Sequence, residues 1–203
     1  MIGKIRKGRS FGGCIRYVTQ KDDAEIIASE GVLLGTAEET ARSFRWQCLL
    51  SPDVAKPVGH IALSFKPEDA PRLTDAFMAR LAGEYLELMG IRNTQFIVVR
   101  HHGTDNPHCH IVFNRVDFDG KVISDSNDFR RNERVTKMLK KKYSLTYSEG
   151  KQSVKTEKLH ASEKVKYEIY RAVKEALRSA DTWKEFQNKL LKMGVEMEFK
   201  YKG

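Results

Sequence analysis

The sequence predicts an α+β domain with a central, mostly antiparallel sheet flanked by helices, followed by a small helical C-terminal segment. Short strand patterns occur in hairpin order with helical patterns between them, which favours this class. Residues 94–101 and 108–116 are almost continuously apolar, as is typical of strands buried on both faces in the middle of a sheet. The turn-forming residues 103–107 between them predict a hairpin.

The N-terminal part is predicted to alternate between strands and helices. Residues 1–7 favour a strand, and Ser10 is a candidate N-cap for a helix over 11–20. Residues 24–34 are mixed in character and predict an irregular or short extended segment. Capping-box spacing at residues 36–39 predicts a helix that runs towards residue 50.

The middle of the chain continues this pattern. Alternation over residues 58–65 predicts a strand with His60, Ala62 and Ser64 on one face and larger apolar residues, at positions 61, 63 and 65, on the other. Helical spacing of apolar residues predicts an amphipathic helix over 72–89. A turn then leads to a short strand at residues 121–123.

The C-terminal third predicts helices separated by a polar stretch. Residues 127–142 form a strongly basic helical pattern that completes a first domain over residues 1–146. Residues 147–160 are polar and indicate a linker. Two helices are predicted within residues 161–203, followed by a strand that is cut off, so we expect the chain to continue in a longer protein.

Composition excludes several classes of protein. No apolar run approaches the roughly 20 residues of a membrane helix, and the basic N-terminus lacks the apolar stretch of a secretory signal. Cys14, Cys48 and Cys109 are widely spaced and predict reduced thiols in a cytoplasmic protein. The net charge of +9 favours a polyanionic partner such as nucleic acid.

Three histidines carry the strongest chemical signal. His108 and His110 alternate with Cys109, so a strand would project both imidazoles from one face. The predicted hairpin would bring His101 beside them, whereas His102 would face the other way. Three imidazoles that leave coordination positions open predict a metal site suited to catalysis. The alternative is that these histidines serve packing alone.

Two other kinds of metal enzyme fit the residues less well. A cupin-like site would need a glutamate shortly after its His-x-His pair, but Phe113, Asn114 and Arg115 occupy that stretch. A zinc hydrolase would need a positioned glutamate base, and the sequence has no HExxH-type pairing.

The segment HHGTDNPHCHIVFNRVD resembles the His-hydrophobic-His motif of HUH endonucleases, specifically relaxases of the mobilisation type. In that family an upstream histidine precedes the pair by seven residues, as His101 precedes His108. The stretch GRSFGGCIRYVTQKDDAE resembles the family's first motif, and HIALSFKPED, which contains Ser64, resembles its second. The likeness covers about residues 4–145.

The resemblance implies a metal-dependent single-strand DNA endonuclease with a central antiparallel sheet. It implies that Tyr17 is the nucleophile, which would attach to one DNA strand at a transfer origin through a 5′-phosphotyrosine and so start mobilisation of a plasmid or transposon. The resemblance also implies a bacterial, cytoplasmic protein, with accessory mobilisation proteins and a coupling protein as candidate partners. His101, His108 and His110 would hold the metal ion.

Imidazole ligands bear on the choice of metal. Mg²⁺ prefers oxygen ligands, whereas Mn²⁺, Zn²⁺, Co²⁺ and Ni²⁺ accept imidazole nitrogen more readily. We expect Mn²⁺ to support activity; the physiological ion stays open, with Mn²⁺ and Mg²⁺ as first candidates and Zn²⁺, Co²⁺ and Ni²⁺ as further ones. The family often has an aspartate two residues after the first histidine; this chain has Gly103 there, and Asp105 or another carboxylate is expected to substitute.

Basic and polar residues are predicted to contact DNA. Lys4, Arg6, Lys7 and Arg9 precede the candidate nucleophile, and further cations occupy the predicted helix over 127–142. The predicted DNA contacts are Lys7, Arg9, Ser64, Asn114, Arg130, Arg131, Arg134 and Lys137. Alternative functions are a rolling-circle replication initiator, a single-tyrosine transposase, or a module that binds metal and DNA without catalysis.

Overall fold

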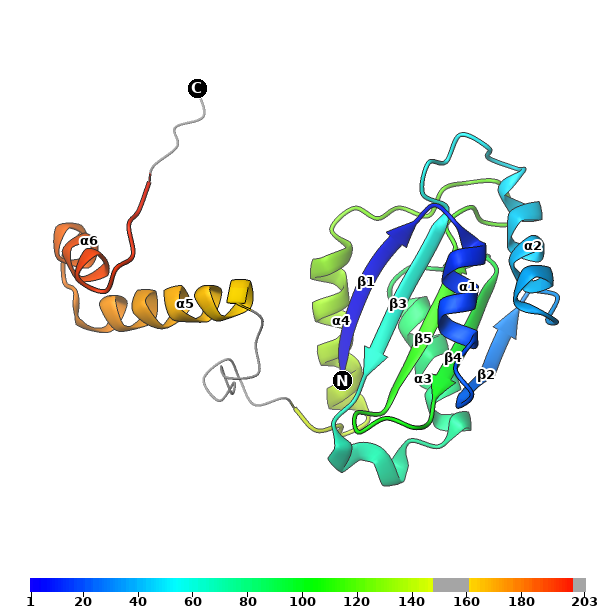
Figure 1. Ribbon diagram of the computed structural model, residues 1–203, viewed down its shortest axis with the longest axis horizontal. Coiled ribbons are helices and arrows are strands. Elements are labelled where there is room, and N and C mark those ends of the chain that lie inside the picture. Colours follow the sequence, from blue (N-terminus) through cyan, green and yellow to red (C-terminus); the bar gives the residue numbers. More distant parts are fainter. Residues whose placement is uncertain (148–160, 199–203) are drawn as a thin grey trace. The chain divides into compact units, whose positions relative to one another are not determined.

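The computed structural model describes residues 1–147 and 161–198, and it divides into two compact units, residues 1–148 and 149–203. The first unit is built on one five-stranded sheet in the order β1-β3-β5-β4-β2 (Figure 1). All neighbouring strands are antiparallel. The strands are β1 (Ile2–Gly8), β2 (Ala24–Glu30), β3 (Val58–Ser64), β4 (Phe96–His101) and β5 (His108–Asn114). The predicted fold class is confirmed.

Helices cover both faces of this sheet. They are α1 (Phe11–Thr19), α2 (Ala37–Cys48), α3 (Asp75–Leu88) and α4 (Asp128–Lys142), with a 3-10 helix η1 (Pro67–Arg72) before α3. Figure 1 shows α1 in front of the sheet and α3 behind it. The second unit contains α5 (Ala161–Ser179) and α6 (Trp183–Lys192).

Local capping explains where α1 and α2 begin. The Ser10 side chain accepts a hydrogen bond from the backbone N–H of Gly13, as an N-cap does. Thr36 and Glu39 form the predicted capping box, in which each side chain bonds the other residue's backbone N–H. Both helix starts predicted from the sequence are confirmed.

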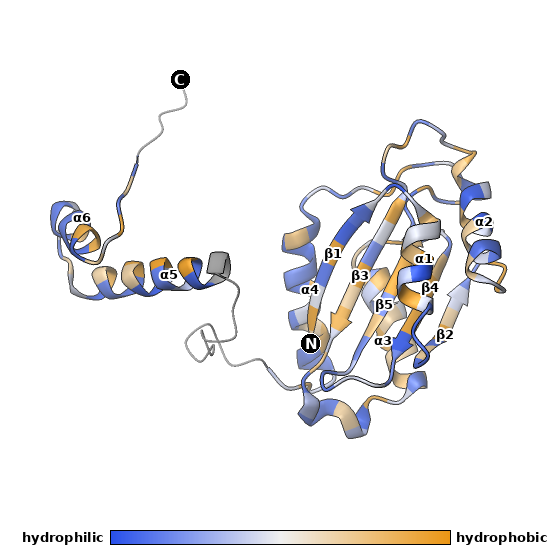
Figure 2. Ribbon diagram, viewed as in Figure 1, coloured by the Kyte–Doolittle hydropathy of each residue, from blue (hydrophilic) through white to orange (hydrophobic). Residues whose placement is uncertain are grey.

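Two apolar layers form the core of the first unit. One layer packs α1 and α2 on the sheet face that carries Val58, Val99 and Val112. The other packs α3 and α4 on the reverse face, against residues that include Ile61 and Ile111. Because β5 and its neighbours are covered on both sides, apolar residues dominate the middle of these strands (Figure 2).

Several elements of the structure differ in detail from those that the sequence predicts. Residues 24–34 contain a full strand, because β2 pairs with β4 and gains its regularity from that partner. The predicted strand at 121–123 is reduced to one bridge between Val116 and Val122. The helix predicted over 72–89 begins only at Asp75, since Pro67 and Pro71 confine the preceding turn to 3-10 geometry.

The second unit is small. Its helices pack around Ala176, Phe186 and Leu190, and residues 195–198 are irregular where the sequence predicted a strand. Within residues 1–147 and 161–198, none of the helices has the length and apolar character needed to span a bilayer. The predicted linker lies, apart from Tyr147, outside the described residues, as do residues 199–203 of the predicted last strand.

A substitution at Gly59 tests the packing of β3 against β5. A Cβ atom at Gly59 would overlap the ring of Phe113, which is buried in the core under α3. We expect Gly59→Ala to lower the free energy of unfolding by about 1–3 kcal/mol, the usual cost of overpacking. Chemical denaturation followed by circular dichroism measures this change.

Gly83→Ala on α3 is the matched control. A Cβ atom there would meet nothing within 4 Å, and alanine favours a helix over glycine. We expect this variant to gain up to about 1 kcal/mol. Equal losses in both variants would contradict the close contact between Gly59 and Phe113.

Candidate active site

The pairing of β4 with β5 brings the three predicted histidines together. His101 lies directly opposite His108 in the antiparallel register, and His110 follows on the same face of β5. The ring centroids lie 5.0 Å apart for His101 and His108, 4.7 Å for His101 and His110, and 5.2 Å for His108 and His110. One nitrogen from each ring lies within 4.8 Å of the others. We call this set the triad, and the sheet face that carries it the triad face.

Each ring of the triad is held through its outward nitrogen. Nε2 of His101 donates to the carbonyl oxygen of Val18 on α1 at 2.8 Å. Nδ1 of His108 donates to the carbonyl oxygen of Asn106 at 3.0 Å. Nδ1 of His110 lies 3.0 Å from Nε2 of His60 on β3. These contacts leave Nδ1 of His101, Nε2 of His108 and Nε2 of His110 to bind a ligand.

The chemistry of these three nitrogens fits a divalent metal ion. Because His101 and His108 each donate their proton to a carbonyl oxygen, their remaining nitrogens face each other as lone pairs, 3.2 Å apart. Two lone pairs at this distance repel unless a cation lies between them. His101 and His110 are also almost fully buried, so water cannot screen that repulsion well. Three neutral imidazoles could therefore hold an ion such as Mn²⁺ or Zn²⁺.

Burial favours the neutral form of His108 and His110 in the triad, and of His60 beside it. Desolvation lowers the pKa of His110 to about 3, with smaller contributions from His60, His101 and His108. Burial also lowers the pKa of His108, and that of His60, where the charge of Arg6 adds to the effect. A neutral imidazole has the free lone pair that a metal requires.

Tyr17 lies beside the triad on α1. Its ring centroid is 5.8 Å from that of His110 and 6.0 Å from that of His60, both in edge-on geometry. The side chain is 62% exposed, although Ile15 and Val18 on the same helix are completely buried. An exposed phenol next to buried imidazoles can reach a substrate that binds at the triad.

An open cleft leads along β1 to Tyr17. It encloses about 470 Å³ and is lined in part by Lys4, Arg6, Arg9, Tyr17, His60 and His110. Lys4 and Arg6 pair with Ala62 and His60 of β3, which places their side chains on the triad face. The cleft therefore combines positive charge with the candidate nucleophile.

The structure separates the other predicted DNA contacts. Arg9 lines the cleft, and Ser64 lies opposite His108 on the triad face. Lys7 points to the reverse face, where its ammonium group pairs with Asp125 and Asp128 at 2.9 and 2.6 Å. These ion pairs match its charge, but Lys7 also lines the cleft, so its predicted contact with DNA stays a prediction.

Asn114 is also corrected. Its side chain is completely buried and donates to the carbonyl oxygen of Phe44 at 3.0 Å. Its Oδ1 accepts from the backbone N–H of Val116 at 3.0 Å. These bonds join α2 to the end of β5, so Asn114 supports the fold and cannot touch DNA.

The predicted basic helix lies away from the cleft. α4 packs through Val135 and Leu139 on the reverse face, and Asn132 bonds the carbonyl oxygen of Gly3 there. Arg130, Arg131, Arg134 and Lys137 are carried by this helix. None of these four residues lines the cleft, and their predicted contact with DNA stays a prediction.

Backbone carbonyl oxygens and His60, and not a carboxylate, make the hydrogen bonds that orient the rings of the triad. The backbone N–H of Gly103 donates to Asp23 at 2.6 Å, and a Cβ at Gly103 would lie 2.7 Å from the same oxygen. Asp23 thus fills the space that an aspartate at 103 would need. Among the described residues, no carboxylate is bonded to the triad, so the predicted role of Asp105 is not supported. The alternation along β3 predicted the face on which His60 lies, whereas no sequence signal marks the Val18 carbonyl.

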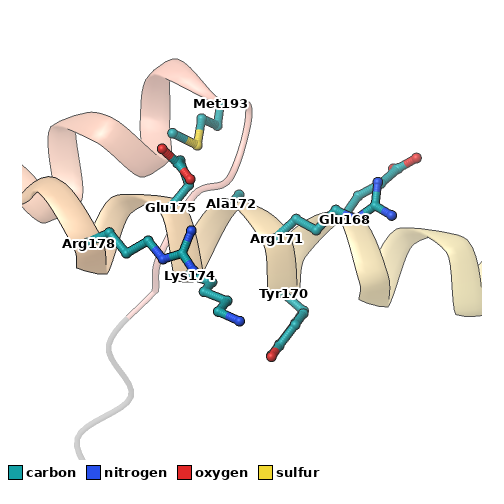
Figure 3. A pocket seen from close by; sticks show the side chains of 8 residues that line it. All are labelled: Glu168, Tyr170, Arg171, Ala172, Lys174, Glu175, Arg178 and Met193. Carbon is teal, nitrogen blue, oxygen red and sulfur yellow. The ribbon is translucent and has the colours of Figure 1, made fainter. Parts of the chain in front are cut away.

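A hollow in the second unit and a second cluster of possible metal ligands are weaker candidates for a functional site. A hollow of about 680 Å³ in the second unit is lined mainly by charged side chains of α5, which point in different directions (Figure 3). Glu25, Asp75 and His102 also lie close together, but they are largely exposed, and Arg100 already pairs with Asp75 at 2.7 Å. Among the residues that the structure describes, only the triad joins buried ligand atoms to a candidate nucleophile and a basic cleft.

The lowered pKa of His110 predicts a pH dependence of stability. The unfolded chain binds a proton at His110 near pH 6.5, whereas the folded chain binds it only near pH 3. The free energy of unfolding should therefore fall as pH falls from about 6.5 towards 3, and be fully restored above that window. Urea titrations in the presence of a chelator, at pH values of about 5 to 7, measure this slope. His110→Gln should flatten the slope, and an unchanged slope would contradict the assignment.

A comparison with known families agrees with this geometry. A model for the nuclease domain of MobA/VirD2-like relaxases matches residues 17–145, a range that includes Tyr17 and all three histidines. A search among curated proteins finds no match to the chain. The matched range covers most of the chain and nearly all of the first unit, and the chain therefore belongs to the relaxase family, through its MobA/VirD2-like nuclease domain.

Proposed function

We propose that this chain nicks one strand of DNA at a transfer origin and becomes covalently attached to it through Tyr17. Oη of Tyr17 would form a bond to the phosphorus of the scissile phosphodiester. The bond from phosphorus to the 3′-oxygen would break, the phenol would lose its proton, and the 3′-oxygen would gain one. The products are a 5′-phosphotyrosine and a free 3′-hydroxyl, and the reverse reaction reseals a strand.

The observation that carries this proposal is the exposed phenol of Tyr17 beside the buried triad. The ring centroid of Tyr17 lies 5.8 Å from that of His110, and the Tyr17 side chain lines the cleft. A non-catalytic module would need no such phenol at its metal ligands. Tyr85 illustrates the contrast, because it is completely buried and bonds Asn132 at 2.8 Å.

The triad would hold the divalent ion. When bound, such an ion withdraws negative charge from a phosphate oxygen and lowers the barrier to attack at phosphorus. Burial lowers the pKa of His108 and His110, and hydrogen bonds to Val18, Asn106 and His60 would fix the orientation of the three rings. We propose Mn²⁺ as an activating ion, with Mg²⁺, Zn²⁺, Co²⁺ and Ni²⁺ to be compared with it.

The cleft along β1 is the proposed path of single-stranded DNA. Lys4, Arg6 and Arg9 would contact phosphates close to Tyr17, and Ser64 would bind near His108. Mobilisation of a plasmid or transposon would further involve accessory proteins and a coupling protein in the bacterial cytoplasm. Family membership favours this role over replication initiation or transposition, which use the same chemistry.

Replacing Tyr17 by phenylalanine tests the nucleophile. Single-stranded oligonucleotides that tile the DNA around the gene would be incubated with protein and Mn²⁺, and covalent adducts would be resolved on denaturing gels. We expect the natural chain to form an adduct with one oligonucleotide. Tyr17→Phe should form none, because phenylalanine lacks the attacking oxygen, yet should bind the same DNA within about 3-fold.

Tyr143→Phe is the matched control, because Tyr143 bonds Glu84 away from the triad face and should not affect the adduct. A chelator should abolish the adduct and added Mn²⁺ should restore it. An adduct on Tyr17→Phe would show that another residue is the nucleophile.

Charge-removing variants test the DNA path. Lys4→Ala with Arg6→Ala should weaken binding of the oligonucleotide and reduce the slope of log K against log salt by about 0.7 for each lost phosphate contact. Arg130→Ala with Arg134→Ala removes the same charge from α4 on the reverse face and should leave affinity within about 2-fold. Fluorescence anisotropy at several salt concentrations measures both. The opposite ranking would place the DNA on α4.

A further inference from the structure

We propose that His60 is a positioning residue that fixes the proton of His110 on Nδ1 and so turns Nε2 of His110 towards the metal ion. This inference rests on the proposed function, because it assigns a role within the same site. His60 lies on β3, outside the triad, and its side chain would touch neither metal nor DNA phosphate in this role.

The sheet register explains how His60 reaches His110. Ala62 stands directly opposite His110, and His60 is its diagonal neighbour, opposite Val112. Diagonal partners on one face are within reach of aromatic side chains. The small side chain of Ala62 leaves room between them, and the two imidazoles meet with centroids 5.1 Å apart.

The hydrogen bond gives His60 its role. His101 and His108 have a backbone carbonyl at their outward nitrogen, which can only accept and so fixes the proton there. His110 has Nε2 of His60 at that position instead, at 3.0 Å. If His60 accepts through Nε2, His110 must carry its proton on Nδ1, and its Nε2 lone pair faces His101 and His108.

The contact between His60 and His110 also bears on the position of Tyr17. Its ring stands edge-on to both His60 and His110, so the imidazole pair forms one wall beside the phenol. Arg6 stands opposite His60 in the register of β1 and β3, and both residues line the cleft. A change that frees His110 would therefore disturb metal binding first and the position of Tyr17 second.

Metal titration of matched variants tests this inference. Mn²⁺ binding to the full chain would be measured by isothermal titration calorimetry for the natural protein, His60→Phe and His60→Gln. His60→Phe keeps a ring but cannot accept, so we expect affinity to fall by about 10–100-fold. His60→Gln can accept through Oε1 and should stay within about 3-fold of the natural protein. His102→Phe, which alters an exposed histidine bonded to Glu25, is the control and should bind Mn²⁺ normally.

The ring nitrogens supply a readout that depends on neither folding of a variant nor activity. Long-range ¹H–¹⁵N correlation spectra of the metal-free natural protein report which nitrogen of His110 carries the proton. We expect protonation on Nδ1, and a mixture of both forms in His60→Phe. A proton on Nε2 of His110 in the natural protein would overturn the inference even if His60→Phe fails to fold.

The outcomes separate this inference from the proposed function. Normal Mn²⁺ affinity in a folded His60→Phe would overturn the role of His60 while leaving the triad as the metal site. Failure of the natural protein to bind Mn²⁺, Zn²⁺, Co²⁺ or Ni²⁺ would overturn the metal site itself, and the role of His60 with it. Weak binding in His60→Phe that His60→Gln restores would establish the positioning role.

Discussion

The antiparallel register between β4 and β5 is the constraint on which the site depends. It sets His101 opposite His108 and leaves His110 on the same face. A slip of one residue would turn every side chain of a strand to the other face and disperse the triad. Burial on both faces resists that slip, because Val98 and Ile111 fill the reverse core while Val99 and Val112 fill the core under α1.

Much of this arrangement could be predicted from the sequence, because it depends on local patterns. Alternation along a strand assigns faces, so His108 and His110 were predicted to project together, and a turn-rich hairpin brought His101 beside them. The start of α1 followed from Ser10, and with it the placement of Tyr17 on a helix. The choice of Tyr17 among seven tyrosines came from the resemblance to relaxases, since helical spacing alone favours a packing role.

Long-range contacts could not be predicted in the same way. Lys7 and Asn114 carry functional groups typical of DNA contacts, yet each is matched by partners far along the chain, at Asp125 and Phe44 respectively. The basic character of α4 indicated a DNA surface, but its apolar residues Val135 and Leu139 decide which face it covers. Charge in a sequence shows what a surface could bind, whereas the layer order of the fold decides whether that surface meets the site.

Helix α1 links the candidate nucleophile Tyr17 to the triad. α1 ends at Thr19, so the carbonyl oxygen of Val18 has no helical partner and accepts from His101 instead. Val18 is completely buried and Tyr17, its neighbour, is exposed, because successive helix residues point about 100° apart. Any shift of α1 that moved Tyr17 would therefore also break the bond that orients His101. The position of the phenol and the geometry of the triad are therefore coupled by this hydrogen bond, in addition to the apolar packing that holds α1 on the sheet.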